Sequence, residues 1–126
     1  MKVVKSIQSK VCVDGSLMKE FLLDEPLTPD FLSFLEVFGT VKRYVHLKQP
    51  YFSFEQEYFI AIKGFVGEST VEVRYKKGFT DLTADYFHLL LFYYRDGESG
   101  IRKMKGIEGS IREKMKIRLP LGQEMG

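Results

Sequence analysis

The sequence predicts an α+β fold in a single domain, in which an antiparallel sheet of about five strands carries two helices on one face. Stretches of alternating apolar and polar residues, typical of half-buried strands, occur on both sides of a segment with helical caps. The connections between strands are short and rich in turn residues, and a second long helical run follows the last strand. The expected order of elements, ββαβββα, differs from the strand–helix alternation of a doubly wound parallel sheet.

The five strands are expected at residues 3–13, 17–23, 40–47, 57–66 and 70–76. In the first strand, apolar and polar residues alternate from Ile7 to Val13, and Asp14-Gly15 can then form a tight turn. The 57–66 strand is apolar on both faces over the letters YFIAI, as expected near the middle of a sheet.

The first helix is expected in the stretch LTPDFLSFLEVFG. Thr28 can cap the first turn, Pro29 suits the first helical position, and Asp30 favours the positive end of the helix dipole. Gly39 can then end the helix. This helix is apolar around most of its circumference, which predicts burial on two sides.

The run DYFHLLLFYYRD, residues 85–96, predicts a second buried helix. Its ten central residues would span about 15 Å as a helix, too little for the roughly 30 Å of a membrane core. Its polar residues fall on one narrow arc, set by Asp85, His88, Arg95 and Asp96. The remaining apolar arc is wider than one sheet face requires. The excess could be covered by the first helix, by the C-terminal segment or by a second copy of the protein.

Residues 1–96 are therefore expected to form the α+β core, followed by a basic, glycine-containing segment over residues 97–126. Apolar residues in this segment have helical spacing, but Gly106 and Gly109 interrupt them. Short helices within the same domain and a loosely docked arm both fit this pattern.

Composition and charge narrow the class of protein. The chain has 126 residues, 44% of them hydrophobic and 14% aromatic, which is typical of a folded domain. A single cysteine, Cys12, excludes an internal disulfide, and the first ten residues contain no apolar stretch of a signal peptide, so we expect a cytoplasmic protein. Residues 14–36 contain six acidic residues and one lysine, whereas residues 101–119 contain seven basic and two acidic residues. This asymmetry can mark surfaces that bind a partner.

The residues favour a protein without catalytic activity. Cys12 lies in a predicted strand, with no helix N-terminus near it in the sequence to activate its thiol. His46 and His88 are 42 positions apart and no second cysteine exists, so no metal site is expected. Because no nucleotide-binding glycine pattern is present either, we assign no catalytic residue, metal or cofactor.

The stretch KGIEGSIREKMKI, residues 105–117, resembles the GxxG loop of KH domains, in which two glycines let the backbone approach the phosphates of a single strand. The variable pair of that loop is here Ile107-Glu108, and its acidic member departs from what a phosphate-binding loop needs. The resemblance implies a nucleic-acid site on the following residues: Lys103, Lys105, Gly106, Gly109 and Arg112.

Together, these observations predict a small intracellular, non-enzymatic binding or assembly module that self-associates as a homodimer. One alternative is a nucleic-acid-binding accessory protein that uses the basic C-terminal segment. Another alternative is a small-molecule binder with a pocket between sheet and helices, lined by Tyr44, His46, Tyr58 and Phe59.

Overall fold

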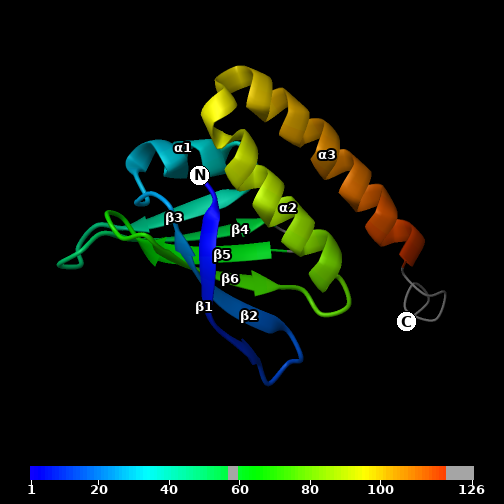
Figure 1. The fold of residues 1–126 in the computed structure, drawn as a ribbon, viewed down its shortest axis with the longest axis horizontal. Coiled ribbons are helices and arrows are strands. Elements are labelled where there is room, and N and C mark those ends of the chain that lie inside the picture. The colour runs from blue at the N-terminus through cyan, green and yellow to red at the C-terminus, as the bar shows by residue number, and fades with distance from the viewer. Residues whose placement is uncertain (57–59, 119–126) are drawn as a thin grey trace.

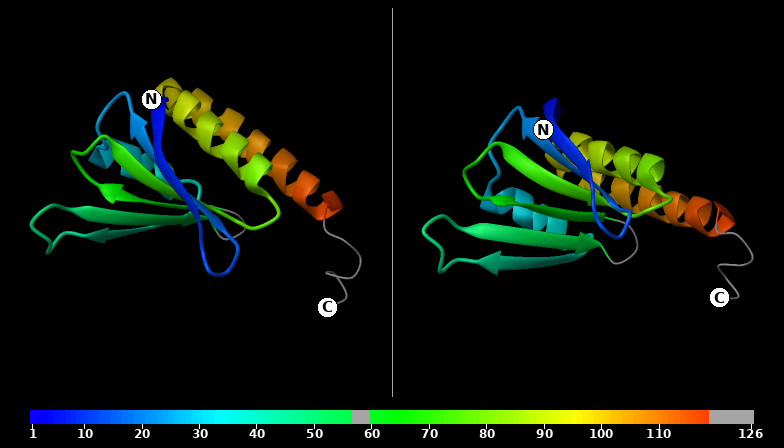
Figure 2. Two further views of the ribbon diagram at one scale, coloured as in Figure 1. Left: turned by 60° about the horizontal axis from the view of Figure 1, so that its bottom comes forward. Right: turned by 90° about the horizontal axis from the view of Figure 1, so that it is seen from below.

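A computed structural model describes residues 1–56 and 60–118 and confirms the α+β class (Figure 1). Six strands form one antiparallel sheet: β1 (Val3–Val11), β2 (Leu17–Leu23), β3 (Thr40–Tyr44), β4 (Tyr51–Gln56), β5 (Ile60–Phe65) and β6 (Thr70–Tyr75). The helices are α1 (Pro29–Glu36), α2 (Thr80–Tyr93), the short 3-10 helix η1 (Tyr94–Asp96) and α3 (Gly97–Arg118). All of these helices lie on the same side of the sheet (Figure 2).

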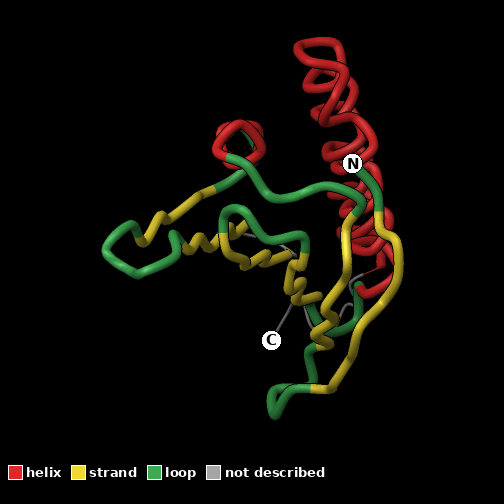
Figure 3. Tube along the Cα trace, turned by 60° about the vertical axis from the view of Figure 1, so that its left-hand side comes forward, coloured by secondary structure: helices red, strands yellow, loops and turns green. Residues whose placement is uncertain are grey.

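The strands follow the order β1-β2-β6-β5-β4-β3, and every neighbouring pair is antiparallel. Strands β3 to β6 therefore form a meander, and the β1–β2 hairpin is added at the β6 edge. The strands follow a curved surface, with the helices on one side of it (Figure 3). This arrangement leaves the opposite face of the sheet uncovered among the residues that the structure describes.

The predicted number of strands was too low by one, because β4 was not predicted. The Gln49-Pro50 pair indicates a break, and the letters YFSFEQ that follow it were not read as a strand. In the structure Phe52 and Phe54 point into the core, whereas Ser53 on the other face is half-buried. The predicted 40–47 strand ends at Tyr44, and residues 57–59 of the predicted 57–66 strand lie outside the described residues.

The first helix has the predicted cap. The backbone N–H of Phe31 donates a hydrogen bond of 3.2 Å to the Thr28 hydroxyl, and Pro29 occupies the first turn. The rings of Phe31 and Phe34 contact Tyr94 of η1, at 5.0 Å and 5.3 Å between ring centroids. Four residues of the helix are buried: Phe31, Leu32, Phe34 and Leu35. These residues belong to the single hydrophobic cluster that fills the space between sheet and helices.

The second helix also forms as predicted, and Asp85 and His88 are exposed on its polar arc. Its Phe87 ring stacks on Phe21 of β2 at 5.5 Å between ring centroids, which places this face of α2 on the sheet. The adjoining apolar flank is covered by α3, whose Met104 is completely buried in the same cluster. The C-terminal segment of the same chain thus covers this part of the wide apolar arc.

From Gly97 to Arg118 the C-terminal segment is one continuous helix, rather than short helices or a loose arm. A single stripe of this helix is buried, formed by Gly100, Met104, Glu108, Ile111 and Met115. Gly106 and Gly109 lie on the exposed side, where a missing side chain costs only helix propensity of about 1 kcal/mol each. The sequence pattern was misleading because glycines on the solvated side of a helix do not disturb its packing.

The turn between α2 and α3 depends on two glycines. Gly97 has a φ of +57°, which only glycine adopts easily. A Cβ on Gly100 would lie 2.2 Å from the carbonyl oxygen of Tyr93, so α3 can approach the end of α2 this closely only through a glycine.

Candidate binding surface

The uncovered face of the sheet carries the side chains that alternate with the core residues of each strand. The antiparallel register brings these side chains into rows that run across the strands. Two rows differ in character: an aromatic row lies near one end of the strands, and a charged row lies two residues further along.

The aromatic row consists of Tyr44, Tyr51 and Phe65. Tyr44 pairs with Tyr51 across β3 and β4, and Tyr51 pairs with Phe65 across β4 and β5. The ring centroids are 5.7 Å apart in the first pair and 4.9 Å apart in the second, with interplanar angles of 44° and 60°. Tyr44 is 43% exposed and Phe65 is 40% exposed, so three contacting rings remain accessible from outside.

The charged row begins with two lysines beside these rings. Lys42 pairs with Ser53, and Ser53 pairs with Lys63, so both lysines lie on the same face as the aromatic row. The sequence from residue 37 to residue 54 contains no acidic residue. We call Tyr44, Tyr51, Phe65, Lys42 and Lys63 the aromatic–basic surface.

The same face becomes acidic toward β6 and β2. Glu72 pairs with Lys63 on one side and lies directly opposite Glu20 on the other, and Gln8 donates a hydrogen bond of 3.2 Å to Glu20. The pKa of the Tyr51 phenol is raised by burial between its neighbours and by the negative charge of Glu72. Glu55, two residues beyond Ser53 on β4, is exposed on this face as well and lines a hollow together with Lys42 and Lys63. The aromatic–basic surface is therefore bordered by carboxylates both toward β6 and along β4.

Two hollows indent this face. One, of about 220 Å³, is lined by residues of β3, β4 and β5, including Lys42, Tyr44 and Lys63. The other, of about 270 Å³, lies where the basic and acidic parts meet and is lined by Tyr51 and Phe65 as well as by both glutamates.

Two of the four residues predicted to line a pocket, Tyr44 and His46, do not lie between the sheet and the helices. Tyr44 lies on the uncovered face, and His46 is exposed in the connection between β3 and β4. Tyr58 and Phe59 lie outside the described residues. Tyr44 is thus part of a candidate site, but on the opposite face of the sheet from the one expected.

The residues predicted from the resemblance to KH domains lie on α3. Gly106 and Gly109 are inside the helix, so the glycine loop that the resemblance implies is absent. The Lys103 ammonium lies 5.7 Å from the Tyr93 ring centroid, and the Lys105 ammonium donates a hydrogen bond of 2.9 Å to the carbonyl oxygen of Val37. These two lysines therefore make contacts within the chain.

A buried polar cluster connects α2 with α3. The Glu108 carboxylate is 6% exposed, accepts a hydrogen bond of 3.2 Å from the Tyr86 hydroxyl and forms an ion pair of 3.0 Å with Arg112. Burial and the adjacent carboxylate raise the pKa of the Tyr86 phenol far above its usual value. The cluster holds the two helices together, and none of the hollows described above is lined by it.

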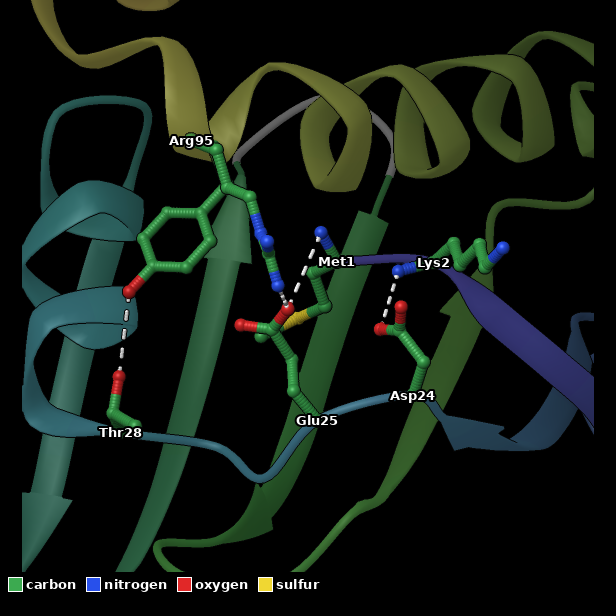
Figure 4. Close-up of polar contacts among 7 residues, drawn as sticks. Met1, Lys2, Asp24, Glu25, Thr28 and Arg95 are labelled. Atoms are coloured by element: carbon green, nitrogen blue, oxygen red, sulfur yellow. Dashed lines mark hydrogen bonds and ion pairs between the residues drawn. The ribbon is translucent and has the colours of Figure 1, made fainter.

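A second polar cluster links Met1 to η1, the short helix that follows α2 (Figure 4). Glu25 forms ion pairs with the Met1 amino group and with Arg95, while the Lys2 backbone N–H donates a hydrogen bond of 2.9 Å to Asp24. Every polar group named here has a protein partner, and Met1, Lys2, Asp24 and Arg95 also line a hollow of about 390 Å³.

Within residues 1–56 and 60–118, no group of three or more His, Cys, Asp or Glu side chains is arranged to hold a metal ion. No helix in these two ranges combines the length and the apolarity that a membrane span requires. Comparison with known protein families, with curated proteins and with solved structures found no match for this chain.

Proposed function

We propose that the protein is a non-enzymatic binding module that contacts an anionic polymer through the aromatic–basic surface. The observation that carries this proposal is the row of three contacting, accessible rings beside two lysines, on the face of the sheet that no described helix covers.

Aromatic side chains stabilise a protein mostly when they are buried, so rings kept on a solvated sheet face suggest a contact surface. Isolated apolar residues are normal on protein surfaces, but these three rings adjoin one another in register. The sequence around them supplies Lys42, Lys48 and Lys63. A positive surface of this kind attracts negatively charged partners.

The basic helix α3 supports the proposal less well than the sheet face does. Lys105 is hydrogen-bonded to the end of α1, Arg112 is paired with the buried Glu108, and Arg118 is paired with Asp81. A partner that used these side chains would have to replace contacts that already stabilise the fold.

Retention on immobilised heparin tests the proposal. We expect the salt concentration that elutes the protein to fall when Lys42 and Lys63 are both replaced by Gln, because two phosphate- or sulfate-binding charges are lost. The matched control replaces Lys103 and Lys114 of α3 by Gln, which removes the same charge, and it should elute close to the wild type. An equal fall in both variants would mean that only net charge matters, and absence of retention would reject an anionic partner.

Self-association remains a second candidate. The argument for it no longer depends on the wide apolar arc of α2, which α3 covers in part, but on an exposed edge of the sheet. Strand β1 is an edge of the sheet, and Val4, Ile7 and Val11 on it are 56%, 45% and 72% exposed. An exposed edge with apolar side chains is a template for pairing with a second copy. Light scattering should then give about twice the chain mass of 14.7 kDa, and Ile7→Lys should return the protein to a monomer. A wild-type monomer at high concentration would reject the dimer.

A cytoplasmic location remains the expectation from the single cysteine, since a reducing compartment suits a free thiol.

A further inference from the structure

We propose that the anionic polymer is a single-stranded nucleic acid, whose bases stack on Tyr44, Tyr51 and Phe65 while its phosphates lie over Lys42 and Lys63. This inference rests on the proposed function, because it names the partner of the same surface.

The aromatic row has the geometry that separate bases require. Its rings come from three adjacent strands, which are about 4.8 Å apart in a sheet. The planes of neighbouring rings are inclined by 44° and 60°, so bases that stack on different rings cannot remain stacked on each other. A duplex keeps its bases stacked inside, whereas a single strand can turn them outward onto aromatic side chains.

Lys42 and Lys63 can contact the phosphates of the same strand. The aromatic row and the charged row run in the same direction across β3, β4 and β5, about 7 Å apart along the strands. A strand of nucleic acid that lies across the β-strands can therefore place its bases on one row and its backbone on the other. Ser53, between the two lysines, adds a hydroxyl group that can hydrogen-bond a phosphate or sugar oxygen.

Carboxylates on the same face limit where the nucleic-acid backbone can lie. Glu72 and Glu20 continue the charged row beyond Lys63, and Glu55 lies on the same face two residues beyond Ser53, so carboxylates repel phosphates on both of these sides. The site is therefore confined to β3, β4 and β5, with two lysines as its phosphate contacts. For single strands, each neutralised phosphate lowers the slope of log binding constant against log salt by about 0.7, so the expected slope is about −1.4.

An anionic membrane is the main competitor for such a surface, because Val45 and Leu47 are exposed in the β3–β4 connection that follows Tyr44. Nucleic acid is favoured since the rings lie in register on the sheet face, where flat groups can stack on them. A membrane would instead be contacted by the tip of the β3–β4 connection, and ring substitutions on the sheet would matter little.

Fluorescence anisotropy with a labelled short oligothymidylate tests the inference on the full chain. Replacing Tyr44 or Phe65 by Ala should weaken binding by about fivefold to 150-fold, as expected for loss of one base–aromatic stack. Replacing Lys42 and Lys63 together by Gln should bring the salt slope close to zero. The control is Phe92→Ala, which removes an aromatic ring of α2 that is 58% exposed and should leave binding unchanged. Thermal melts of each variant separate loss of binding from loss of folding.

Each outcome has a clear meaning. Binding that survives both ring substitutions, or that is as tight for a duplex of the same length, overturns the inference. If heparin retention then still depends on Lys42 and Lys63, the proposed function stands with a different polymer. Binding to vesicles of anionic lipid without binding to the oligonucleotide would replace nucleic acid by a membrane surface. Absence of binding to heparin, oligonucleotide and vesicles rejects the proposed function itself.

Discussion

Strand β4 carries aromatic rings on both of its faces, and the two sets have opposite roles. Phe52 and Phe54 point toward the helices and are 0% and 1% exposed. Tyr51 directly precedes Phe52 in the sequence but points to the other face, where it contacts Tyr44 and Phe65 in the accessible row. The difference shows that successive residues of one strand can belong to the buried core and to an accessible aromatic row, because neighbouring side chains point to opposite faces of the sheet.

Two consequences follow for substitutions. On the covered face, a lost side chain leaves a cavity in a packed interior, and the free energy of unfolding decreases strongly. On the uncovered face, the same change removes atoms that already contact water, and stability changes little. Function should respond in the opposite order.

The largest effect is expected for Phe54→Ala. The ring is buried between the sheet and the helices, so its removal should lower the free energy of unfolding by about 3–5 kcal/mol. Urea denaturation with the midpoint and slope determined separately measures this loss. A decrease below about 1 kcal/mol would mean that the helices do not pack on this face as described.

A smaller decrease is expected for Glu108→Gln, which removes the charge from the buried cluster between α2 and α3. The carboxylate has two partners, Tyr86 and Arg112, and hydrogen bonds to a charged group contribute about 1.5–3 kcal/mol each. Because Arg112 is 40% exposed and can still reach water, we expect a total loss of about 1–3 kcal/mol in the same denaturation assay. Glu113→Gln on the exposed side of α3 is the matched control and should have no measurable effect.

A pH effect smaller than either loss is expected at the C-terminal end of α3. Arg118 donates two hydrogen bonds to Asp81 and holds the pKa of that carboxyl at about 2, below the usual 3.8. Because the pKa is lower in the folded state, the pair stabilises the fold above about pH 4, and this contribution is lost as the pH falls toward 2. The protection factors of the amides along the last turn of α3, which take out the intrinsic pH dependence of hydrogen exchange, should therefore decrease over this range. The Asp81→Asn variant should show no such pH dependence, and an unchanged dependence would mean that another group is responsible.

The smallest effect on stability is expected for Tyr44→Ala, although it should have the largest effect on binding. The ring is 43% exposed on an edge strand, so the free energy of unfolding should change by no more than about 0.5 kcal/mol. Thermal melts beside the binding assay measure both quantities. A stability loss above 1 kcal/mol would make the aromatic row a structural element and weaken its interpretation as a contact surface.

Local sequence patterns predicted helices α1 and α2, because the residues that indicate each helix lie within or next to it. The cap at Thr28 and the polar arc with Asp85 and His88 identified two helices, because both cues depend only on residues a few positions apart. Strand β4 was missed since its break at Pro50 was taken as the end of sheet structure. Helix α3 was not recognised as one helix, because no sequence pattern says which side of a helix its glycines occupy.

The candidate site was only partly predictable for a related reason. Tyr44 was singled out from the sequence, but Tyr51 and Phe65 join it through strand register, which depends on pairings across the whole meander. One signal was present: residues 37–54 combine lysines and aromatic residues with no acidic residue. Such a stretch indicates affinity for anions, yet only the register shows that the rings form a row.

The strand order has a consequence for how the chain is made. All neighbouring strands are consecutive in the sequence except β2 and β6, where Leu22 pairs with Thr70. Hairpins of the β3–β6 meander can close early because their loops are short, whereas the β2–β6 pairing must bring together distant segments. During synthesis, the β1–β2 hairpin is made before β6, so β2 lacks its second partner strand until β6 has been synthesised. Until β6 is synthesised, both edges of the hairpin and the apolar side chains of β2 remain open to wrong partners, so the N-terminal hairpin is where we expect nascent chains to aggregate first.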